Sequence, residues 1–495
     1  MRHIILGPPG TGKTTKLLDL VDEKIKEGVS LSKIGCFSFT RKSAEEAISR
    51  ACVKFDLERK ELPFFRTLHS LALRQLGLPK DSLMQRHYYK LFGEKVGIPL
   101  NGINLEDENG IVFSSDKEFL SHIDISRAKQ ISLKEQWAYN AKDMSWEKLD
   151  WIHRTYNDFK KTNEYYDYTD MLVKFVKEGV PPKLDFLFID EAQDLSKLQW
   201  QAVEKLADTA KEIYIAGDDD QAIFRWAGAD IEHFINMKGE VHILKQSYRI
   251  PKSTHSFCVA LSKRIKNRRE KEYIPRDYEG ELKFHNTFNM DVSQGEWLIL
   301  ATTNYLLDKV QTELIEQGVF FKRKNKLSIK NSIINGIYNW EDLRKGKKII
   351  KDDVESIYDL MSSKIGVKHG FKNLNTLDDK QPVNLHNLIQ NYGLLRKDEW
   401  YKALDLIPLI DRVYIRATLR RGAKLSKPKV RLSTIHGAKG SECQNVVLFT
   451  DLSREADKQY FINPDDQTRV MYVGATRAKE ALHIIHPQTT RGFRL

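Results

Sequence analysis

Residues 7–14 read Gly-Pro-Pro-Gly-Thr-Gly-Lys-Thr and satisfy the pattern G-x-x-x-x-G-K-[ST]. They directly follow an apolar run at residues 3–6 and precede a helical pattern containing Leu17, Leu18 and Val21. Glycines let backbone N–H groups close around phosphate oxygens, and the start of the helix adds a favourable dipole. A chance glycine-rich turn is the alternative, but the strand–loop–helix context argues against it. The sequence therefore predicts a nucleoside-triphosphate site.

Two side chains of this loop have expected roles. Lys13 is expected to reach the β- and γ-phosphates, and the Thr14 hydroxyl to hold Mg²⁺. The residues predicted to bind the nucleotide here are Gly7, Gly10, Thr11, Gly12, Lys13, Thr14 and Thr15.

Short apolar runs rich in β-branched or aromatic residues recur along the chain, each followed by a polar or helical stretch. The clearest are residues 3–6, 34–39, 185–189, 212–216, 241–244, 297–301, 445–450 and 481–485. Strands that alternate with helices indicate parallel α/β sheets. Because the runs fall before about residue 245 and after about residue 295, we expect two such sheets. Segments near residues 80–165 and 326–426 carry apolar residues at helical spacing and are predicted to be helical insertions.

The composition fits this picture. A chain of 495 residues exceeds one ordinary domain, so two to four domains are expected. The chain has 80 basic and 68 acidic residues and a formal net charge of +12, which favours a polyanionic partner. No run approaches the roughly 18 apolar residues of a membrane span. The four scattered cysteines argue against a disulfide framework or a cysteine metal cluster and favour a reducing cytosol.

A second acidic element separates hydrolysis from simple phosphate transfer. The apolar run at residues 184–189 ends in Asp190 and Glu191. A carboxylate at the end of the strand can hold the Mg²⁺ shell, which fits Asp190, and the adjacent Glu191 can orient and deprotonate a water molecule. An acidic pair that only caps a helix is common elsewhere, but it is a poor explanation directly after the apolar run at residues 186–189.

A third strand runs into residues 217–226. Gln221 is an uncharged group able to sense a γ-phosphate, and Phe224 and Trp226 follow closely enough to couple it to a base-stacking surface. The alternative for the two aromatic residues is burial beneath the sheet, and we favour exposure for Trp226. The three aspartates at residues 218–220 are interpreted mainly as turn and cap residues.

Together these and further motifs resemble the superfamily 1 helicases of the UvrD/Rep/PcrA type, in order and over nearly the full chain. Besides the segments above, the matching residues are Phe39-Thr40-Arg41-Lys42-Ser43-Ala44, Thr67-Leu68-His69-Ser70, Leu244-Lys245-Gln246-Ser247-Tyr248-Arg249, residues 432–442 and residues 471–478. Eight ordered motifs are far more specific than any one of them.

The resemblance implies two RecA-like parallel-sheet domains, each with an inserted, mainly helical subdomain, and ATP in the cleft between them. The first RecA-like domain is expected at residues 1–80 and 165–248 with a helical insert at 81–164. The second is expected at residues 249–325 and 427–495 with a helical insert at 326–426.

The resemblance also assigns roles at the nucleotide. Arg249 and Arg477 would reach the γ-phosphate, Tyr248 would stack on the adenine, and Glu442 would contact the ribose. From the residues alone, Tyr248 could equally be an ordinary core aromatic. Catalytic roles are thus expected for Glu191, Gln221, Arg249 and Arg477, with ATP and Mg²⁺ as nucleotide and cofactor. In the family, a segment that reads the adenine precedes the loop. Because the loop here begins at Gly7, the sequence leaves open whether ATP is strictly preferred over other triphosphates.

Several residues are candidates for nucleic-acid contacts. Thr67, His69, Thr434 and His436 lie where predicted strands meet helices, where they could bond phosphates. A basic cluster at residues 416–431 contains Arg420 and Arg421 without any acidic residue and favours a phosphate-binding surface. The complete set of predicted nucleic-acid contacts is Thr67, His69, Phe224, Trp226, Thr434, His436, Arg420 and Arg421.

The sequence therefore predicts an ATP-dependent DNA helicase or translocase that moves 3′→5′, acts on single strands and junctions, and works in a bacterial or virus-infected host cytoplasm. Replication or repair proteins are expected partners, and no membrane is. Two alternatives stay open: an RNA or hybrid helicase, and an ATP-gated DNA-binding switch or protein-displacing translocase without processive unwinding.

Overall fold

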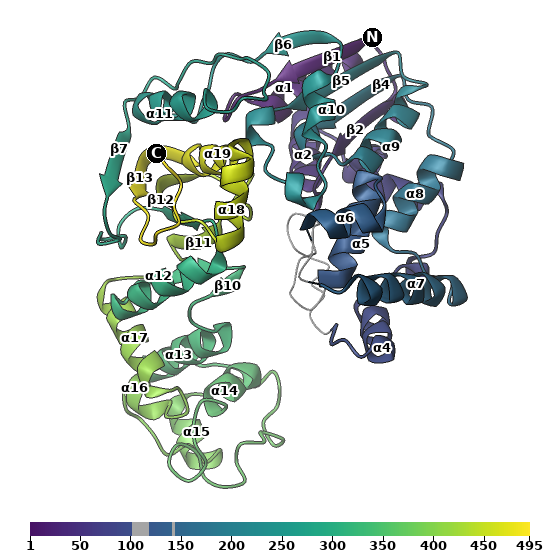
Figure 1. Cartoon of the computed structure of the whole chain (residues 1–495). Coiled ribbons are helices and arrows are strands. Elements are labelled where there is room, and N and C mark those ends of the chain that lie inside the picture. Colours follow the sequence, from purple (N-terminus) through teal and green to yellow (C-terminus); the bar gives the residue numbers. More distant parts are fainter. Residues whose placement is uncertain (101–117, 141–143) are drawn as a thin grey trace. The chain divides into compact units, whose positions relative to one another are not determined.

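The computed structural model describes residues 1–100, 118–140 and 144–495. Residues 101–117 and 141–143, which belong to the first predicted insertion, lie outside the described residues. The chain forms two compact units (Figure 1). The first unit comprises Met1–Glu281, Ile435–Ser441 and Arg454–Glu480, and the second comprises Leu282–Thr434, Glu442–Ser453 and Ala481–Leu495.

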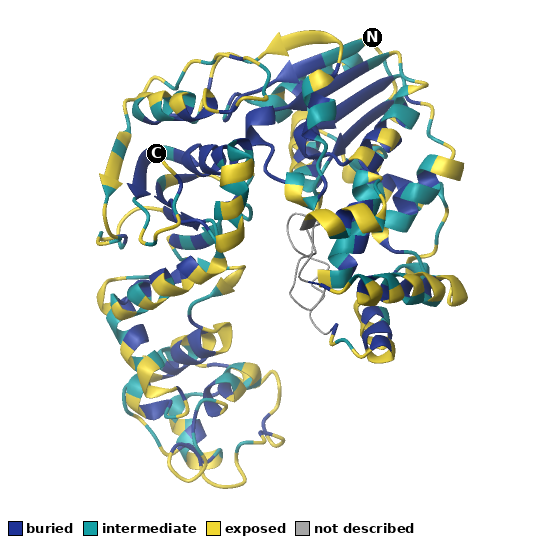
Figure 2. Ribbon diagram, in the orientation of Figure 1, coloured by how far each residue is buried: buried dark blue, intermediate teal, exposed yellow. Residues whose placement is uncertain are grey.

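The first unit is built on a six-stranded parallel sheet of order β3-β2-β4-β5-β1-β6. Its strands are β1 (Arg2–Leu6), β2 (Ile34–Ser38), β3 (Phe65–Thr67), β4 (Phe186–Asp190), β5 (Glu212–Gly217) and β6 (Glu240–Ile243). The central strands are buried on both faces, as crossover connections require, whereas β6 at the edge is exposed (Figure 2).

Helices cover both faces of this sheet. Because side chains alternate along a strand, Ile5 packs in the same core as α1 (Lys13–Lys26) and α2 (Arg41–Phe55). Ile4 and Leu6 pack in the opposite core with α3 (Leu68–Gln75), α8 (Tyr168–Glu178) and α9 (Lys197–Ala207). The remaining helices of this unit outside the insertion are α10 (Ile231–Asn236), α11 (Lys252–Ser262), α18 (Arg454–Ile462) and α19 (Pro464–Ala475).

The first insertion is helical, as the sequence predicts. Its described helices are α4 (Arg86–Val96), α5 (Glu118–Lys129), α6 (Leu133–Asn140) and α7 (Trp146–Thr162). Phe92, Leu149 and Tyr156 are fully buried in their shared core. This core is separate from those that flank the sheet, so the insertion packs around its own apolar residues.

The second unit contains most of a seven-stranded sheet of order β10-β9-β11-β8-β12-β13-β7. Its strands are β7 (Glu281–His285), β8 (Trp297–Ala301), β9 (Phe321–Arg323), β10 (Lys326–Leu327), β11 (Val430–Thr434), β12 (Cys443–Phe449) and β13 (Ala478–Ile485). Strand β8 pairs in parallel with both β11 and β12. Helix α12 (Asn304–Glu316) shares a core with these strands.

A second helical insertion lies between β10 and β11. It contains α13 (Asn331–Arg344), α14 (Lys351–Tyr358), α15 (Leu385–Asn391), α16 (Trp400–Ala403) and α17 (Leu409–Arg420). Trp340 and Tyr358 are among its fully buried side chains. The prediction of two parallel-sheet regions with helical insertions is therefore confirmed, whereas the exact domain boundaries stay a prediction.

Two smaller findings concern the cysteines and the helices. All four cysteines are free thiols, three of them buried. Within the described ranges, no helix combines the length and the apolar character that crossing a bilayer requires.

Candidate functional site

The phosphate-binding loop joins β1 to α1 at the carboxyl end of the sheet. Gly10 and Gly12 have φ angles of 72° and 80°, in the left-handed region where a side chain is strained. A Cβ on Gly7 would lie 2.0 Å from Cγ of Lys13. Lys13 Nζ donates to the Gly7 carbonyl at 2.9 Å. The loop therefore needs glycine at these positions, and its lysine lies folded over the backbone that would hold the phosphates.

The hydroxyl and carboxylate predicted to hold Mg²⁺ are in direct contact. Thr14 Oγ1 donates to Asp190 Oδ2 at 2.6 Å. Asp190 is buried at the end of β4, and burial together with the nearby Glu191 carboxylate raises its pKa to about 6. Two converging oxygen ligands fit the preference of Mg²⁺. At neutral pH the carboxylate is ionised and available to the cation.

Glu191 directly follows β4 and carries the negative charge that a general base needs. Its backbone is in the left-handed region, with a φ of 53°, and Gln193 Nε2 donates to its Oε2 at 2.5 Å. Burial would raise the pKa of Glu191, but Lys13 and Lys439 outweigh it, so the pKa lies below the usual value. The carboxylate is thus held ionised. The strained backbone of this residue is typical of functional sites.

A hydrogen-bonded path leads from Glu191 to Arg477. Gln193 Oε1 accepts from the Asp218 backbone N–H at 2.9 Å, and Asp218 Oδ2 accepts from Gln221 Nε2 at 2.7 Å. The Arg477 guanidinium then donates to Gln221 Oε1 at 2.8 Å. Arg477 is buried, and it directly precedes β13. We call this series of residues the Glu191–Arg477 path.

Lys439 is a functional candidate that sequence reasoning missed. Its ammonium lies 2.5 and 2.7 Å from the two Asp194 carboxylate oxygens and donates to the Gln221 carbonyl at 2.7 Å. It also lies over the Phe224 ring at 5.1 Å. The signal was present, because the lysine stands inside the motif at residues 432–442, but nothing in the spacing gave it a role.

Tyr248 and Arg249 adjoin the phosphate-binding loop. The Tyr248 backbone N–H donates to the Gly10 carbonyl at 2.8 Å, and Ser247 Oγ donates to the Pro9 carbonyl at 2.7 Å. A Cβ on Gly10 would lie 2.4 Å from Cβ of Arg249. Tyr248 is 71% exposed, which excludes the alternative of an ordinary core aromatic. Its ring is free of the core, as stacking on a base requires.

The other residues predicted to contact the nucleotide are Thr11, Thr15 and Glu442. Thr11 is buried and its hydroxyl donates to the Pro8 carbonyl at 2.8 Å, whereas Thr15 is exposed on α1. Glu442 is exposed in the second unit, where its carbonyl accepts from Arg431 at 2.9 Å. The ribose role of Glu442 stays a prediction.

Phe224, Trp226 and His436 form an aromatic group in the first unit. The Trp226 ring meets the His436 ring edge-on at 5.7 Å, and the Phe224 ring lies 6.1 Å from it. Trp226 is 45% exposed, whereas Phe224 is 3% exposed and also contacts Phe39. The exposure expected for Trp226 is thus observed. Phe224 lies in the buried position weighed as its alternative, where it supports His436.

The two histidines in this region are neutral at physiological pH. Burial lowers the pKa of both His69 and His436 to about 4. His69 contacts Tyr168 edge-on at 6.0 Å, and Thr67 caps α3 by accepting from the Ser70 N–H at 3.2 Å. Each histidine can therefore offer a neutral hydrogen-bonding group to a nucleic acid but no charge. Thr434 ends β11 in the second unit.

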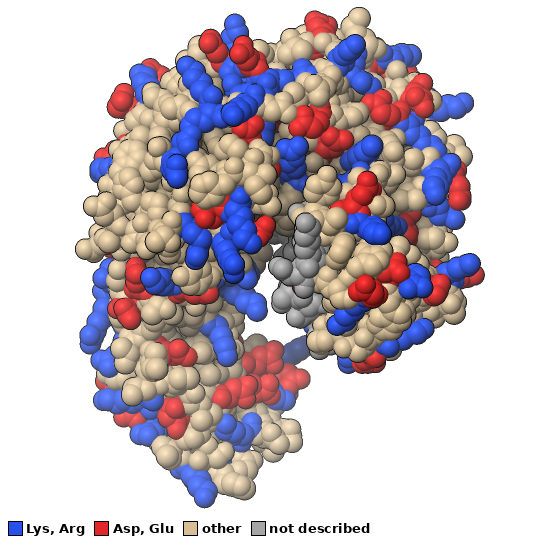
Figure 3. All heavy atoms as spheres, viewed as in Figure 1, with Lys and Arg blue, Asp and Glu red and all other residues tan. Residues whose placement is uncertain are grey.

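Basic clusters differ in their exposure. In the cluster at residues 264–271, Lys271 is buried and pairs with Asp218 at 3.1 Å and Asp219 at 2.7 Å, and Arg268 pairs with Asp220. The three aspartates thus anchor a buried ionic network, besides the cap that Asp218 forms. Arg420 and Arg421 end α17 exposed, with Arg421 3.5 Å from Asp291. Figure 3 shows basic side chains interspersed with acidic ones.

Comparisons with known proteins bear on this arrangement. A family model described as the UvrD/REP helicase N-terminal domain matches residues 2–242, and one described as the UvrD-like helicase C-terminal domain matches residues 196–489. The ATP-dependent DNA helicase Rep of Buchnera aphidicola subsp. Acyrthosiphon pisum is 22% identical, across 97% of this chain and 91% of that protein.

Two further matches are more limited. The ATP-dependent DNA helicase PcrA of Staphylococcus epidermidis is 25% identical, across 54% of this chain and 38% of that protein. A solved structure described as that of PRRSV helicase covers 99% of this chain and 53% of that chain, with a TM-score of 0.35 and 10% identity. That likeness is too low to support an argument.

Proposed function

Because this chain belongs to the UvrD/Rep/PcrA-like superfamily 1 helicases and is an ATP-dependent DNA helicase, we propose that it moves 3′→5′ along single-stranded DNA and unwinds duplexes ahead of it. ATP hydrolysis would drive this movement. The two sheet regions of the chain correspond to two RecA-like domains.

The proposed chemistry is hydrolysis at the phosphate-binding loop. The backbone of residues 7–12 and the Lys13 ammonium would bind the phosphates. Thr14 and Asp190 would hold Mg²⁺, which neutralises charge on the phosphate oxygens. Glu191 would orient a water molecule and take its proton, and Tyr248 would stack on the base. The contact of Thr14 with Asp190 and the low pKa of Glu191 support these assignments.

The Glu191–Arg477 path is the observation that carries the proposal. An arginine that stabilises charge on the transferred phosphoryl group raises the rate by about 10³–10⁵. Here Arg477 is bonded to Gln221, which is linked through Asp218 and Gln193 to the base. A change at Gln221 would therefore reach the base and the arginine together. Arg249, next to Gly10, is proposed as a second cationic contact.

The same path approaches the proposed DNA surface. Lys439 bonds the Gln221 carbonyl and lies over Phe224, which contacts His436, and His436 contacts Trp226. Stacking on an exposed tryptophan tolerates any base, which suits a protein that must hold each base in turn. We propose that base stacking at Trp226 is transmitted to Gln221 through these contacts. That ATP binds in a cleft between two domains stays a prediction from the family.

Strand displacement tests the direction. The protein is mixed with ATP, Mg²⁺ and duplexes that carry either a 3′ or a 5′ single-stranded tail. We expect displacement from the 3′-tailed duplex and little from the 5′-tailed one. Equal displacement from both tails, or from the 5′ tail alone, contradicts the direction. Failure on both tails with intact DNA-stimulated ATPase favours the ATP-gated switch, and a requirement for an RNA strand favours the RNA or hybrid helicase.

A further inference from the structure

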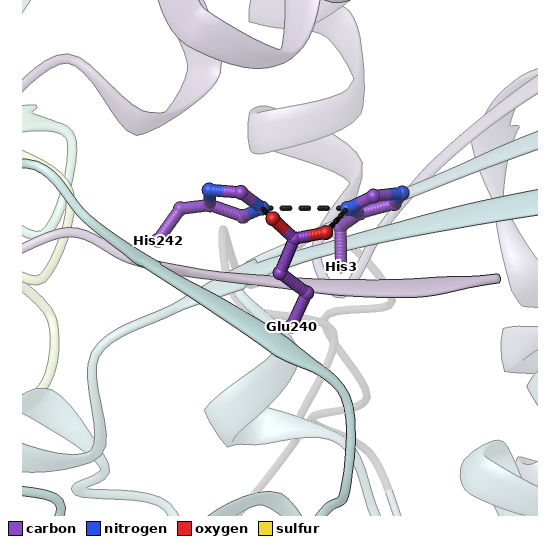
Figure 4. A group of neighbouring side chains, drawn as sticks. All are labelled: His3, Glu240 and His242. Carbon is purple, nitrogen blue, oxygen red and sulfur yellow. Dashed lines mark hydrogen bonds and ion pairs between the residues drawn. The ribbon is translucent and has the colours of Figure 1, made fainter.

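A group of metal-binding residue types lies at the exposed edge of the six-stranded sheet, away from the phosphate-binding loop. It consists of His3 on β1 and Glu240 and His242 on β6 (Figure 4). Among the residues that the structure describes, these are the three metal-binding side chains whose ligand atoms converge, all within 4.8 Å of one another. The nucleotide chemistry described above uses none of them.

The strand register explains why these side chains meet. Strands β1 and β6 are parallel, and His3 is the Cα partner of Glu240. Paired residues project from the same face of a sheet, and so do residues two apart on one strand, such as Glu240 and His242. The three side chains therefore share one face. Figure 4 shows their polar ends turned toward one another.

The distances match those of a metal site. His3 Nδ1 lies 3.3 Å from His242 Nε2 and 3.2 Å from a Glu240 oxygen, and His242 Nε2 lies 3.5 Å from the other Glu240 oxygen. Zinc bonds of about 2.0–2.1 Å in a tetrahedron place neighbouring ligand atoms about 3.3 Å apart. A single His3 N–H proton cannot serve both of its contacts at full strength, whereas one cation can satisfy all three groups.

The histidine on β1 is held in place by neighbouring rings. The His3 ring stacks on Tyr214 at 4.7 Å and 11°, and Tyr214 stacks on Phe188 at 4.9 Å and 6°. The two ligands on β6 are more exposed, so they can adjust around an ion and leave a fourth position for water. One fixed and two adjustable ligands make an accessible site.

We propose that His3, Glu240 and His242 bind a zinc-type divalent cation through two imidazoles and one carboxylate. Imidazole favours zinc and similar transition metals, whereas Mg²⁺ prefers oxygen ligands, so the ion of the nucleotide site would not compete. The bound ion would tie the edge strand β6 to β1. The segment that follows β6 contacts the phosphate-binding loop through Ser247 and Tyr248. The bound ion would therefore also restrict the motion of this segment.

Titration of the untagged full chain with Zn²⁺, with the heat of binding measured by calorimetry, tests the proposal. We expect one equivalent to bind to the unmodified protein. The substitutions His242→Ala and Glu240→Gln should each weaken binding by more than roughly 100-fold, the upper end of what losing an outer-shell partner costs. His369→Ala is the matched control, because His369 is an exposed histidine elsewhere and its loss should change nothing.

Two further readouts separate metal binding from a loss of folding. Both variants should bind ATP normally, and Zn²⁺ should slow backbone hydrogen exchange in residues 240–249 of the unmodified protein only. Cobalt should give ligand-field absorption bands in the unmodified protein that the His242→Ala variant lacks. Mg²⁺ should bind equally well to the unmodified protein and to the His242→Ala variant. Zinc binding that is unchanged in both variants, or no zinc binding at all, overturns the proposal.

Discussion

The nucleotide site and the proposed DNA surface are built in different ways. The groups around Glu191 are bonded to one another and mostly buried, from Thr14 and Asp190 to Gln221 and Arg477. Among the predicted nucleic-acid residues only Phe224 is buried. The others are a helix cap (Thr67), a strand end (Thr434), two half-buried histidines, one exposed tryptophan and two exposed arginines. Phosphate chemistry needs charges fixed in advance in a low dielectric, whereas a surface that passes one base after another must stay open.

The largest expected effect comes from removing Arg477. Arg477→Ala should lower DNA-stimulated ATP hydrolysis by about 10³–10⁵, because a charge at the transferred phosphoryl group is lost. Arg477→Lys should recover little, since an ammonium cannot reproduce the geometry of the guanidinium. Steady-state ATPase assays measure the loss, and binding of a fluorescent ATP analogue checks that the site is still formed. If the Arg477→Ala variant hydrolysed ATP at the wild-type rate, the arginine would have only a structural role.

A smaller effect is expected on the open side of the comparison. Trp226→Ala should weaken single-stranded DNA binding by about 1–3 kcal/mol, the contribution of one stacked base, while ATP binding is retained. Fluorescence anisotropy with a labelled oligonucleotide measures it. Trp151→Ala is the matched control, because Trp151 has the same 45% exposure but lies on α7, outside the proposed DNA surface. Equal losses in the two variants would contradict the assignment.

The smallest effect concerns the proton on Asp190. Because the pKa of Asp190 is raised to about 6, its carboxylate is ionised above that pH and becomes protonated as the pH falls through it. Hydrolysis should therefore fall below pH 6, by up to tenfold per pH unit. Proton and Mg²⁺ compete for the same oxygen, so added Mg²⁺ should restore activity at pH 5.5. If it does not, another group is responsible.

The sequence predicts the buried half of this comparison well. Residues 7–14, Asp190 and Glu191 each follow a strand, and strand ends in parallel sheets converge, so their proximity follows from the pattern. The links between them do not follow. Nothing in the spacing shows that Gln193 bridges its near neighbour Glu191 to Asp218, or that Lys439 pairs with Asp194. The contacts to Asp218 and from Lys439 join residues that are far apart in the chain.

Prediction is weaker where burial decides the role. Phe224 and Trp226 are two residues apart in the sequence, yet one is buried and the other is exposed. The basic cluster at residues 264–271 resembles a solvated surface, but Lys271 neutralises buried aspartates. Charge and aromatic character can be read from a sequence, whereas their exposure depends on the tertiary packing. The same limit hid His3, Glu240 and His242, which meet only through strand pairing.

ATP hydrolysis with and without single-stranded DNA, in the unmodified protein and in Glu191→Gln, tests most directly whether the base and the DNA surface are linked. We predict that DNA raises the rate of the unmodified protein severalfold or more. Glu191→Gln should be slower by about 10²–10⁴, the usual contribution of a general base, and insensitive to DNA, while still binding both ATP and DNA. A rate that DNA leaves unchanged in the unmodified protein, or full activity in Glu191→Gln, would contradict the account.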